Sequence, residues 1–422
     1  MIGARLARLG VPAIILERRA RPGDSWRHRY ASLATHDPVW MNHLPYIPFP
    51  SHWPTYFPKD KLADWLEMYV KVMELNYWGG SACTGAAYDE GEGVWRVTVD
   101  KGGAEVTLRP RQLVLATGVH GAPFVPDFPG AASFKGPQVH SGNYKGDEEW
   151  EGLRCVVIGS NNSAHDICHD LWERGALPTM IQRTSTHVTR SAVWQDMYLK
   201  PLYSEEALAS GMTTDKADMI FASIPYRVHA VLDVPTYTAM AKRDAPFYKR
   251  LTDVGFLLDF GEDGSGLFMK WLRRGAGFYI DTGASDLISS GDIGLKSSVG
   301  VDSIGEASVK LTDGTVLPAD VIVYATGWAS LSDSLGKMTS PEVAGKVGRC
   351  WGLGSNTTGD PGPWEGELRN MYKPTAQRGL WIFGGSFMQC RFYSQFLALQ
   401  VKARMEGLHT PVYGGPEVAT AN

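Results

Sequence analysis

The sequence of 422 residues has few cysteines, no long apolar run and little net charge, and each shortage excludes a class of protein. Cysteine occurs five times, and no Cys-x-x-Cys pair is present. This pattern predicts reduced thiols in a cytoplasmic setting and disfavours enzymes that work through a redox disulfide. No apolar run approaches the length of about 18 residues that a membrane span needs.

The charge and composition narrow the possibilities further. A net charge of −4 gives no reason to expect nucleic acid or an anionic membrane as a partner. With 44% hydrophobic and 20% charged residues, the chain is globular and can bury large cores. Its length fits two or three domains. We predict no metal site, and the sequence does not indicate an oligomeric state.

The strongest functional signal is a strand pattern that turns on glycine into a helical pattern. Residues 154–158 form the strand, Gly159 follows, and the helix begins within the next few residues. Such a turn presents backbone N–H groups at a helix N-terminus, which is the geometry that holds a pyrophosphate. The motif is degenerate, because Asn161 and Ala164 stand where glycine is usual. We predict cofactor contacts from Gly159, Ser160, Asn161, Ser163 and Ala164.

A second pattern, Phe134-x-Gly136-x-x-x-His140-x-x-x-Tyr144, ends just before this strand. It resembles the fingerprint of flavin-containing monooxygenases, which are class B flavoprotein monooxygenases. The related Baeyer–Villiger enzymes end the pattern in Trp, so the resemblance is closer to the flavin-containing monooxygenase and indole-pyruvate monooxygenase branch. His140 is a candidate cofactor residue, and the alternative is a structural histidine at a domain junction.

The first residues match the second half of a nucleotide-binding unit. Residues 1–10 predict a helix that Gly10 caps, and residues 11–16 predict a buried strand that ends at Glu17. An acidic residue at this place typically bonds the ribose hydroxyls of a dinucleotide. We expect a preceding strand with GxGxxG just upstream of Met1, but the sequence lacks it. A truncated gene product and a true loss of the loop both stay open as explanations.

The tripeptide Ala-Thr-Gly occurs twice, at residues 116–118 and 325–327, each time after a predicted hairpin and a buried strand. This weak internal repeat indicates that each copy closes one nucleotide-binding unit. Near the C-terminus, Gly384 and Gly385 lie between a strand and a helix pattern. That helix N-terminus could place positive potential near a flavin ring, and the alternative is a simple turn.

These patterns predict an α/β fold with two dinucleotide-binding, Rossmann-like domains, the first without its first strand and Gly-rich loop. We expect an FAD-binding domain over residues 1–148, an NADPH-binding domain over 149–328 and a C-terminal return to the FAD-binding domain over 329–422. An aromatic-rich insertion spans about 187–290.

The resemblance implies a cytoplasmic NADPH- and FAD-dependent monooxygenase. Such an enzyme inserts one oxygen atom from O2 into a small organic substrate through a flavin hydroperoxide. The further candidate cofactor residues are Glu17, Gly23, Trp26, Thr117, Gly118, Thr326, Gly327, Gly384 and Gly385.

The choice of nicotinamide cofactor is predicted from the strand that follows the glycine turn. An NAD-specific unit favours Asp or Glu at the end of that strand. Here Arg183 and Thr184 stand there instead. A guanidinium can form a forked contact with a 2′-phosphate, so we expect NADPH, with a solvated arginine as the alternative.

His36 is the candidate catalytic residue. Many family members carry a Thr-Asn pair near this place, but here residues 30–35 lead to His36, as in plant indole-pyruvate monooxygenases. A hydrogen-bond donor at this place could stabilise the flavin hydroperoxide, and a neutral imidazole suffices as donor. The alternative is a histidine that caps the turn at Asp37 and Pro38.

Two other functions stay open at this point. One is an uncoupled NADPH oxidase that releases peroxide. The other is a truncated nucleotide-binding protein without catalysis. The substrate, and whether nitrogen, sulfur or carbon is oxygenated, cannot be derived from the sequence.

Overall fold

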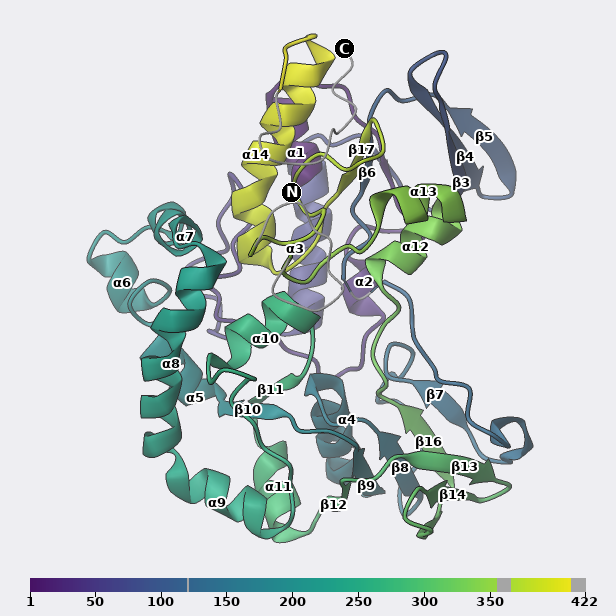
Figure 1. Cartoon of the computed structure of the whole chain (residues 1–422), viewed down its shortest axis with the longest axis vertical. Helices are drawn as coiled ribbons and strands as arrows, with labels where there is room; N and C mark the ends of the chain where they lie inside the picture. Colours follow the sequence, from purple (N-terminus) through teal and green to yellow (C-terminus); the bar gives the residue numbers. More distant parts are fainter. Residues whose placement is uncertain (120, 355–365, 411–422) are drawn as a thin grey trace.

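Parallel β-sheets form two units in this computed structural model, which describes residues 1–119, 121–354 and 366–410 (Figure 1). The larger sheet has five parallel strands in the order β12-β9-β8-β16-β7. Their bounds are Gly294–Ser297, Leu177–Gln182, Arg154–Ile158, Val321–Tyr324 and Gln138–His140. Helices α4 (Asn162–Glu173) and α11 (Ala284–Ser290) pack together beside this sheet. We call this part the second unit, and it has the α/β architecture that the sequence predicts.

The first unit contains two separate parallel pairs. Strand β1 (Ile15–Leu16) pairs with β2 (Tyr77–Trp78), and β6 (Leu113–Leu115) pairs with β17 (Leu380–Ile382). Among the described residues, no hydrogen-bonded ladder joins the two pairs. The strand predicted over residues 11–16 is only two residues long, and β1 has a partner on one edge alone.

Three helices cover the first unit (Figure 1). They are α1 (Ile2–Arg8), α3 (Lys59–Val72) and α14 (Phe387–Met405). Helix α1 packs against α14, so the first and last helices of the described chain are neighbours. Gly10 ends α1 at a φ of 68°, and the N–H of Val11 bonds the carbonyl of Leu6 at 2.9 Å. This is a Schellman cap, which confirms the predicted helix end.

Both predicted hairpins form, and each leads into a strand that ends in Ala-Thr-Gly. The first is the antiparallel sheet β3-β4-β5, and the second is β13-β14-β15. The first three strands span Ser81–Asp89, Val94–Lys101 and Ala104–Leu108, and the second three span Val301–Gly305, Ser308–Leu311 and Val316–Pro318. The internal repeat predicted from the sequence is therefore present in the structure.

The aromatic-rich insertion is mainly helical. A parallel pair, β10 (His187–Arg190) with β11 (Phe278–Asp281), connects it to the second unit. Its helices are α5 (Ser191–Trp194), a π-helix (Gln195–Leu199), α6 (Glu205–Ala209), α7 (Thr214–Ser223), α8 (Tyr226–Arg243), α9 (Ala245–Asp253) and α10 (Gly266–Arg274). Trp194 stacks on Tyr198 with ring centroids 4.2 Å apart. Aromatic packing therefore supplies much of the local core.

The remaining short elements connect these parts. They are α2 (Asp24–Arg27), a 3₁₀ turn (Ala131–Ser133), α12 (Leu331–Met338) and α13 (Pro341–Val347). All five cysteines are free thiols, and only Cys83 is not buried. Within the described ranges, no helix combines the length and apolarity needed to cross a bilayer, and no three His, Cys, Asp or Glu side chains converge as a metal site.

Two chain segments cross between the units side by side. One runs from residue 121 to 125, after the first Ala-Thr-Gly, and the other runs from Thr326 to Ser330 and begins inside the second. The N–H of Phe124 bonds the carbonyl of Gly327 at 3.1 Å, and the N–H of Ala329 bonds the carbonyl of Ala122 at 2.9 Å. The two crossings form a two-stranded connection, which we call the strap.

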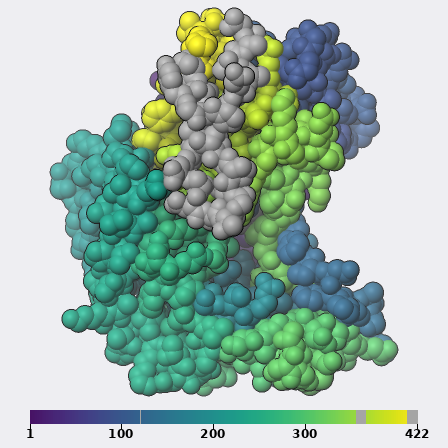
Figure 2. Space-filling model, viewed as in Figure 1, coloured from purple at the N-terminus to yellow at the C-terminus, as the bar shows by residue number. Residues whose placement is uncertain are grey.

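The molecular surface is hollowed on the right-hand side of Figure 2, between the upper lobe and the lower one.

Candidate cofactor and catalytic site

The glycine turn after β8 has the geometry that the sequence predicts. Gly159 adopts a φ of 132°, and a Cβ there would lie 2.3 Å from the carbonyl oxygen of Ala325. Only glycine fits between the two strand ends. Helix α4 then begins with Asn161 as N-cap, and no side chain caps it. Its N-terminal N–H groups and helix dipole therefore offer an anion site.

Ser160, Ser163 and Ala164 surround this turn in different ways. The Ser160 hydroxyl bonds the Thr186 hydroxyl at 2.9 Å, and Ala164 is fully buried against the sheet. Ser163 lies half-buried on the first turn of α4. Arg183 and Thr184 are exposed just beyond the end of β9, the strand next to β8. The residues predicted to contact phosphate thus lie at two neighbouring strand ends, β8 and β9, at one edge of the sheet.

The fingerprint residues His140 and Tyr144 form hydrogen bonds that join parts of the second unit. The Nε2–H of His140 donates to the carbonyl of Gly327 at 2.9 Å, and its Nδ1 accepts from the N–H of Gly142 at 3.0 Å. Burial lowers the pKa of His140, which keeps the ring neutral. The Tyr144 hydroxyl donates to Asp170 of α4 at 2.5 Å. Both ring nitrogens of His140 are committed to backbone, so the structural role that the sequence left open accounts for all its hydrogen bonds.

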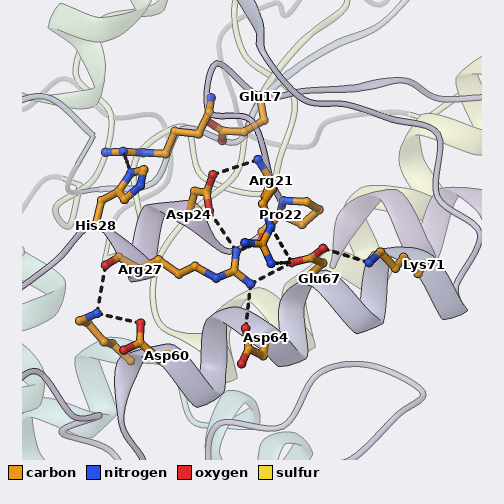
Figure 3. A network of polar contacts seen from close by, with 12 residues as sticks. Glu17, Arg21, Pro22, Asp24, Arg27, His28, Asp60, Asp64, Glu67 and Lys71 are labelled. Carbon is orange, nitrogen blue, oxygen red and sulfur yellow. Dashed lines mark hydrogen bonds and ion pairs between the residues drawn. The ribbon is translucent and has the colours of Figure 1, made fainter. Parts of the chain in front are cut away.

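A polar network holds the turn at Pro22 and Asp24 against helix α3 (Figure 3). Arg27 bonds Asp24 at 3.0 Å and Glu67 at 2.9 Å, and Arg21 bonds Glu67 at 2.7 Å. Hydrogen bonds from Lys71 and Arg21 hold the pKa of Glu67 at about 2. These charge-assisted contacts fix the loop between β1 and α2.

The candidate FAD residues of the first unit gather in two places. Glu17 follows β1 and accepts from the N–H of Arg19 at 2.9 Å. Trp26 stacks on Phe387 at the start of α14, with ring centroids 6.1 Å apart.

Gly384 lies beside Gly118, since a Cβ on Gly384 would be 3.4 Å from the Gly118 Cα. Gly385 adopts a φ of 127°, and Thr117 is exposed next to this contact. The structure therefore brings Gly118, Gly384 and Gly385 together.

The N-terminus of α14 differs from that of α4. Ser386 and Gln389 form a capping box, in which each side chain accepts from the backbone N–H of the other. Those two N–H groups are already bonded, and the dipole of α14 still favours an anion near its N-terminus.

His36 lies at the contact between the first unit and helix α4. Its Nε2 bonds Asp166 Oδ2 at 3.2 Å, and the Tyr30 hydroxyl donates to the same oxygen at 2.6 Å. Burial disfavours the charged imidazolium, but the Asp166 carboxylate more than offsets this and raises the pKa of His36. Burial likewise works against the ionised Asp166, yet His36 and Tyr30 lower its pKa. We call Tyr30, His36 and Asp166 the seam cluster.

Arg29 extends the seam cluster towards the strap. Its guanidinium lies 5.2 Å from the centroid of the Trp328 ring, which in turn packs edge-on against His140. Burial lowers the pKa of Arg29, and its Nε has no hydrogen-bond partner in the described part of the chain.

Sequence reasoning missed Asp166 and Asp170. An aspartate inside a helix is usually read as solvent-facing. The available signal was their spacing of four residues, which places both on one face of α4.

The residues present fit a nicotinamide dinucleotide well. The uncapped α4 N-terminus suits a pyrophosphate, and the exposed Arg183 and Thr184 have the chemistry that suits a 2′-phosphate. For FAD, Glu17 suits a ribose and the Gly384–Gly385 turn suits the ring end. In the described first unit, no strand runs through an uncapped glycine turn into a long helix, so its pyrophosphate has no equivalent cradle.

Comparison with known proteins gives consistent matches. The profile of the family described as "Flavin-binding monooxygenase-like" matches residues 20–209. Indole-3-pyruvate monooxygenase YUCCA1 of Oryza sativa subsp. japonica is 32% identical over 330 residues, which cover 78% of this chain and 73% of the relative. Indole-3-pyruvate monooxygenase YUCCA4 of the same organism is 29% identical over 343 residues, covering 78% and 71%.

Solved structures share the fold. Cyclohexanone monooxygenase bound to ε-caprolactone superposes with a TM-score of 0.66 at 16% identity, covering 97% of this chain and 87% of that one. A flavin monooxygenase from Stenotrophomonas maltophilia gives 0.61 at 18% identity, covering 96% and 95%. OTEMO in complex with FAD and NADP gives 0.66 at 17% identity, covering 96% and 83%.

Proposed function

Because this chain belongs to the flavin-binding monooxygenase-like family, we propose that it inserts one oxygen atom of O2 into a small organic substrate. The chain is a flavin-dependent monooxygenase with FAD and NADPH as its cofactors. When bound, NADPH would supply a hydride, and the reduced flavin would activate O2 for the transfer of one oxygen atom. Every other task falls to the residues of this chain.

The observation that supports the proposal is that one helix carries both a candidate cofactor-binding end and the hydrogen-bond partner of the candidate catalytic histidine. Helix α4 presents its uncapped N-terminus after Gly159, and one turn later Asp166 bonds His36 of the first unit. A pyrophosphate at the N-terminus and the His36 ring therefore have a fixed relation. Preorganised donors of this kind stabilise developing charge without reorganisation.

Each candidate residue has a stated task in this proposal. Arg183 forks onto the 2′-phosphate, helped by the hydroxyl of Thr184. Glu17 accepts from ribose hydroxyls, and the Gly118 and Gly384 backbones approach the flavin closely. His36 donates a hydrogen bond at the reacting centre.

Indole-3-pyruvate is the first compound to test, since the curated relatives carry it in their names. Purified full-length chain, with FAD added and its bound flavin measured by absorbance, is supplied with NADPH and O2. The screen covers 2-oxo acids, amines, thioethers and ketones. A product that carries one ¹⁸O atom from ¹⁸O2, with little peroxide per NADPH, is the expected result.

Two outcomes contradict the proposal. NADPH consumption that yields peroxide alone with every substrate would identify an uncoupled oxidase. Nucleotide binding without NADPH consumption would identify a binding protein without catalysis. His36→Ala adds a second test, because it should raise peroxide per NADPH while flavin reduction stays near normal.

A further inference from the structure

The protonation pattern of His36 is constrained by Asp166. The Asp166 side chain is only 10% exposed, and its Oδ2 takes the bond from His36 Nε2. An ionised carboxylate can only accept hydrogen bonds. Since the His36 contact and the Tyr30 hydroxyl both lower the pKa of Asp166, the carboxylate is ionised at neutral pH. The proton on His36 must therefore lie on Nε2.

This assignment decides what the other ring nitrogen offers. A neutral imidazole carries one donor and one acceptor nitrogen, whereas the imidazolium carries two donors. With the Nε2 proton given to Asp166, neutral His36 presents only a lone pair at Nδ1. Within the described chain, Nδ1 has no hydrogen-bond partner, so it is free to bond a reacting group.

We propose that Asp166 is a positioning residue of the monooxygenase site, which orients the His36 ring so that Nδ1 donates a hydrogen bond only in the imidazolium state. This inference rests on the proposed function, and it corrects the expectation that a neutral imidazole suffices as donor. A neutral His36 could donate from Nδ1 only by giving up its bond to Asp166. The seam cluster thus makes the donor available below the pKa of His36 and removes it above.

The surroundings of His36 favour the imidazolium. Asp166 and Asp37 both raise its pKa, while burial and Arg29 lower it, and the balance lies above the ordinary value of 6.5. Three further titratable groups lie nearby: His165 beside Asp166 on α4, Tyr30 on the loop of His36, and Tyr56 facing Asp37. His165 itself is held neutral, since burial lowers its pKa to about 4.

The decisive experiment is ¹⁵N NMR titration of the histidines in the full chain. The His36 signal is identified among the 11 histidines by its loss in His36→Gln. We expect a pKa above 6.5 and a neutral form with its proton on Nε2. Asp166→Asn should lower that pKa by about one unit or more, the size of shift that a close opposite charge causes. Glu173→Gln removes the same charge from an exposed position on α4 and should leave it unchanged.

A neutral form with its proton on Nδ1 in the wild-type chain would overturn the inference, even if Asp166→Asn fails to fold. Tyr30→Phe provides a second variant, because it keeps the carboxylate and should keep the raised pKa of His36. Loss of the raised pKa in Tyr30→Phe as well would mean that loop packing, rather than the Asp166 charge, sets it.

Activity gives a separate readout. In the wild type, the peroxide formed per NADPH should rise as the pH increases through the pKa of His36. In Asp166→Asn this rise should occur at lower pH, displaced by the change in the His36 pKa that NMR measures. The KM for NADPH should stay unchanged. An unmoved profile would overturn the positioning role alone. The expected NMR result without any oxygenated product would instead overturn the proposed function, and with it the role of Asp166 in oxygenation.

Discussion

At the scale of single residues, a nearby backbone carbonyl oxygen can leave no room for a Cβ, so that only glycine fits. Gly159 has a left-handed φ and a carbonyl oxygen 2.3 Å from its absent Cβ. Gly102 also has a positive φ, of 62°, but no atom lies within 4 Å of a Cβ there. A side chain at Gly102 would meet only backbone strain, whereas one at Gly159 would also collide with a carbonyl oxygen.

Gly159→Ala should weaken NADP⁺ binding at least about tenfold, because the turn must move away from Ala325 and take the α4 N-terminus with it. The strained φ alone costs about 1–3 kcal/mol of stability. Calorimetric titration of NADP⁺ and thermal unfolding measure the two effects. Gly102→Ala is the control, and equal losses in both variants would contradict the special role of Gly159.

Arg183→Ala should raise the KM for NADPH about 10- to 100-fold and change the KM for NADH little. Hydrogen bonds to a charged group contribute about 1.5–3 kcal/mol, and only NADPH carries the 2′-phosphate. Steady-state kinetics with both cofactors give the comparison. Arg250→Ala, an exposed arginine on α9 that pairs with Asp286, is the matched control. Equal effects on both cofactors would remove Arg183 from the site.

At the scale of elements, the fingerprint stretch is explained by what it connects. β7 ends in His140, which bonds the turn after β16, and Tyr144 then bonds α4. The stretch therefore ties the second Ala-Thr-Gly to helix α4.

His140→Leu should destabilise the protein by about 1–3 kcal/mol for each backbone group left unpaired, namely the Gly327 carbonyl and the Gly142 N–H. His140→Gln should recover part of this loss, since its side-chain amide can donate to the Gly327 carbonyl. Urea unfolding measures both. If folded His140→Gln binds NADP⁺ more than about tenfold more weakly than wild type, His140 contacts the cofactor directly and the structural account is wrong.

The elements also show how far the sequence could predict the structure. Strand β8 and the turn at Gly159 were predicted because a buried run followed by glycine has few other solutions. The seam cluster could not be predicted, because Asp166 meets His36 across 130 positions of sequence. The length of β1 was also missed, since a strand's extent depends on a neighbour that its own residues do not specify. The domain boundaries and the individual site residues stay predictions.

At the scale of the whole molecule, the seam cluster makes the contact between the units depend on pH. The pKa of His36 is raised, so its contribution to stability is full below about 6.5 and is lost as pH rises through the raised pKa. The pKa of Asp166 is lowered, so its contribution is present above 3.8 and is lost as pH falls through the lowered pKa. The seam cluster therefore stabilises the folded protein most between about pH 3.8 and pH 6.5, where both contributions are present.

Unfolding free energy should fall on raising the pH from about 6 to about 9 in the wild type, and this fall should be smaller in His36→Gln. Urea unfolding at each pH gives the difference between the two proteins, in which groups common to both cancel. His169→Gln, which removes a histidine on α4 whose ion-pair partner Glu173 is exposed, serves as the control. Identical pH slopes in wild type and His36→Gln would show that the seam cluster contributes nothing to stability.

The strap has a topological consequence. The chain leaves the first unit through residues 121–125 and returns through Thr326–Ser330, so two covalent connections join the two units. A protease that cuts one of these crossings leaves the two units covalently joined through the other. The hydrogen bonds of Phe124 and Ala329 keep the cut ends in place. A single nick would thus convert the protein into two fragments that separate on a denaturing gel yet travel as one particle in solution.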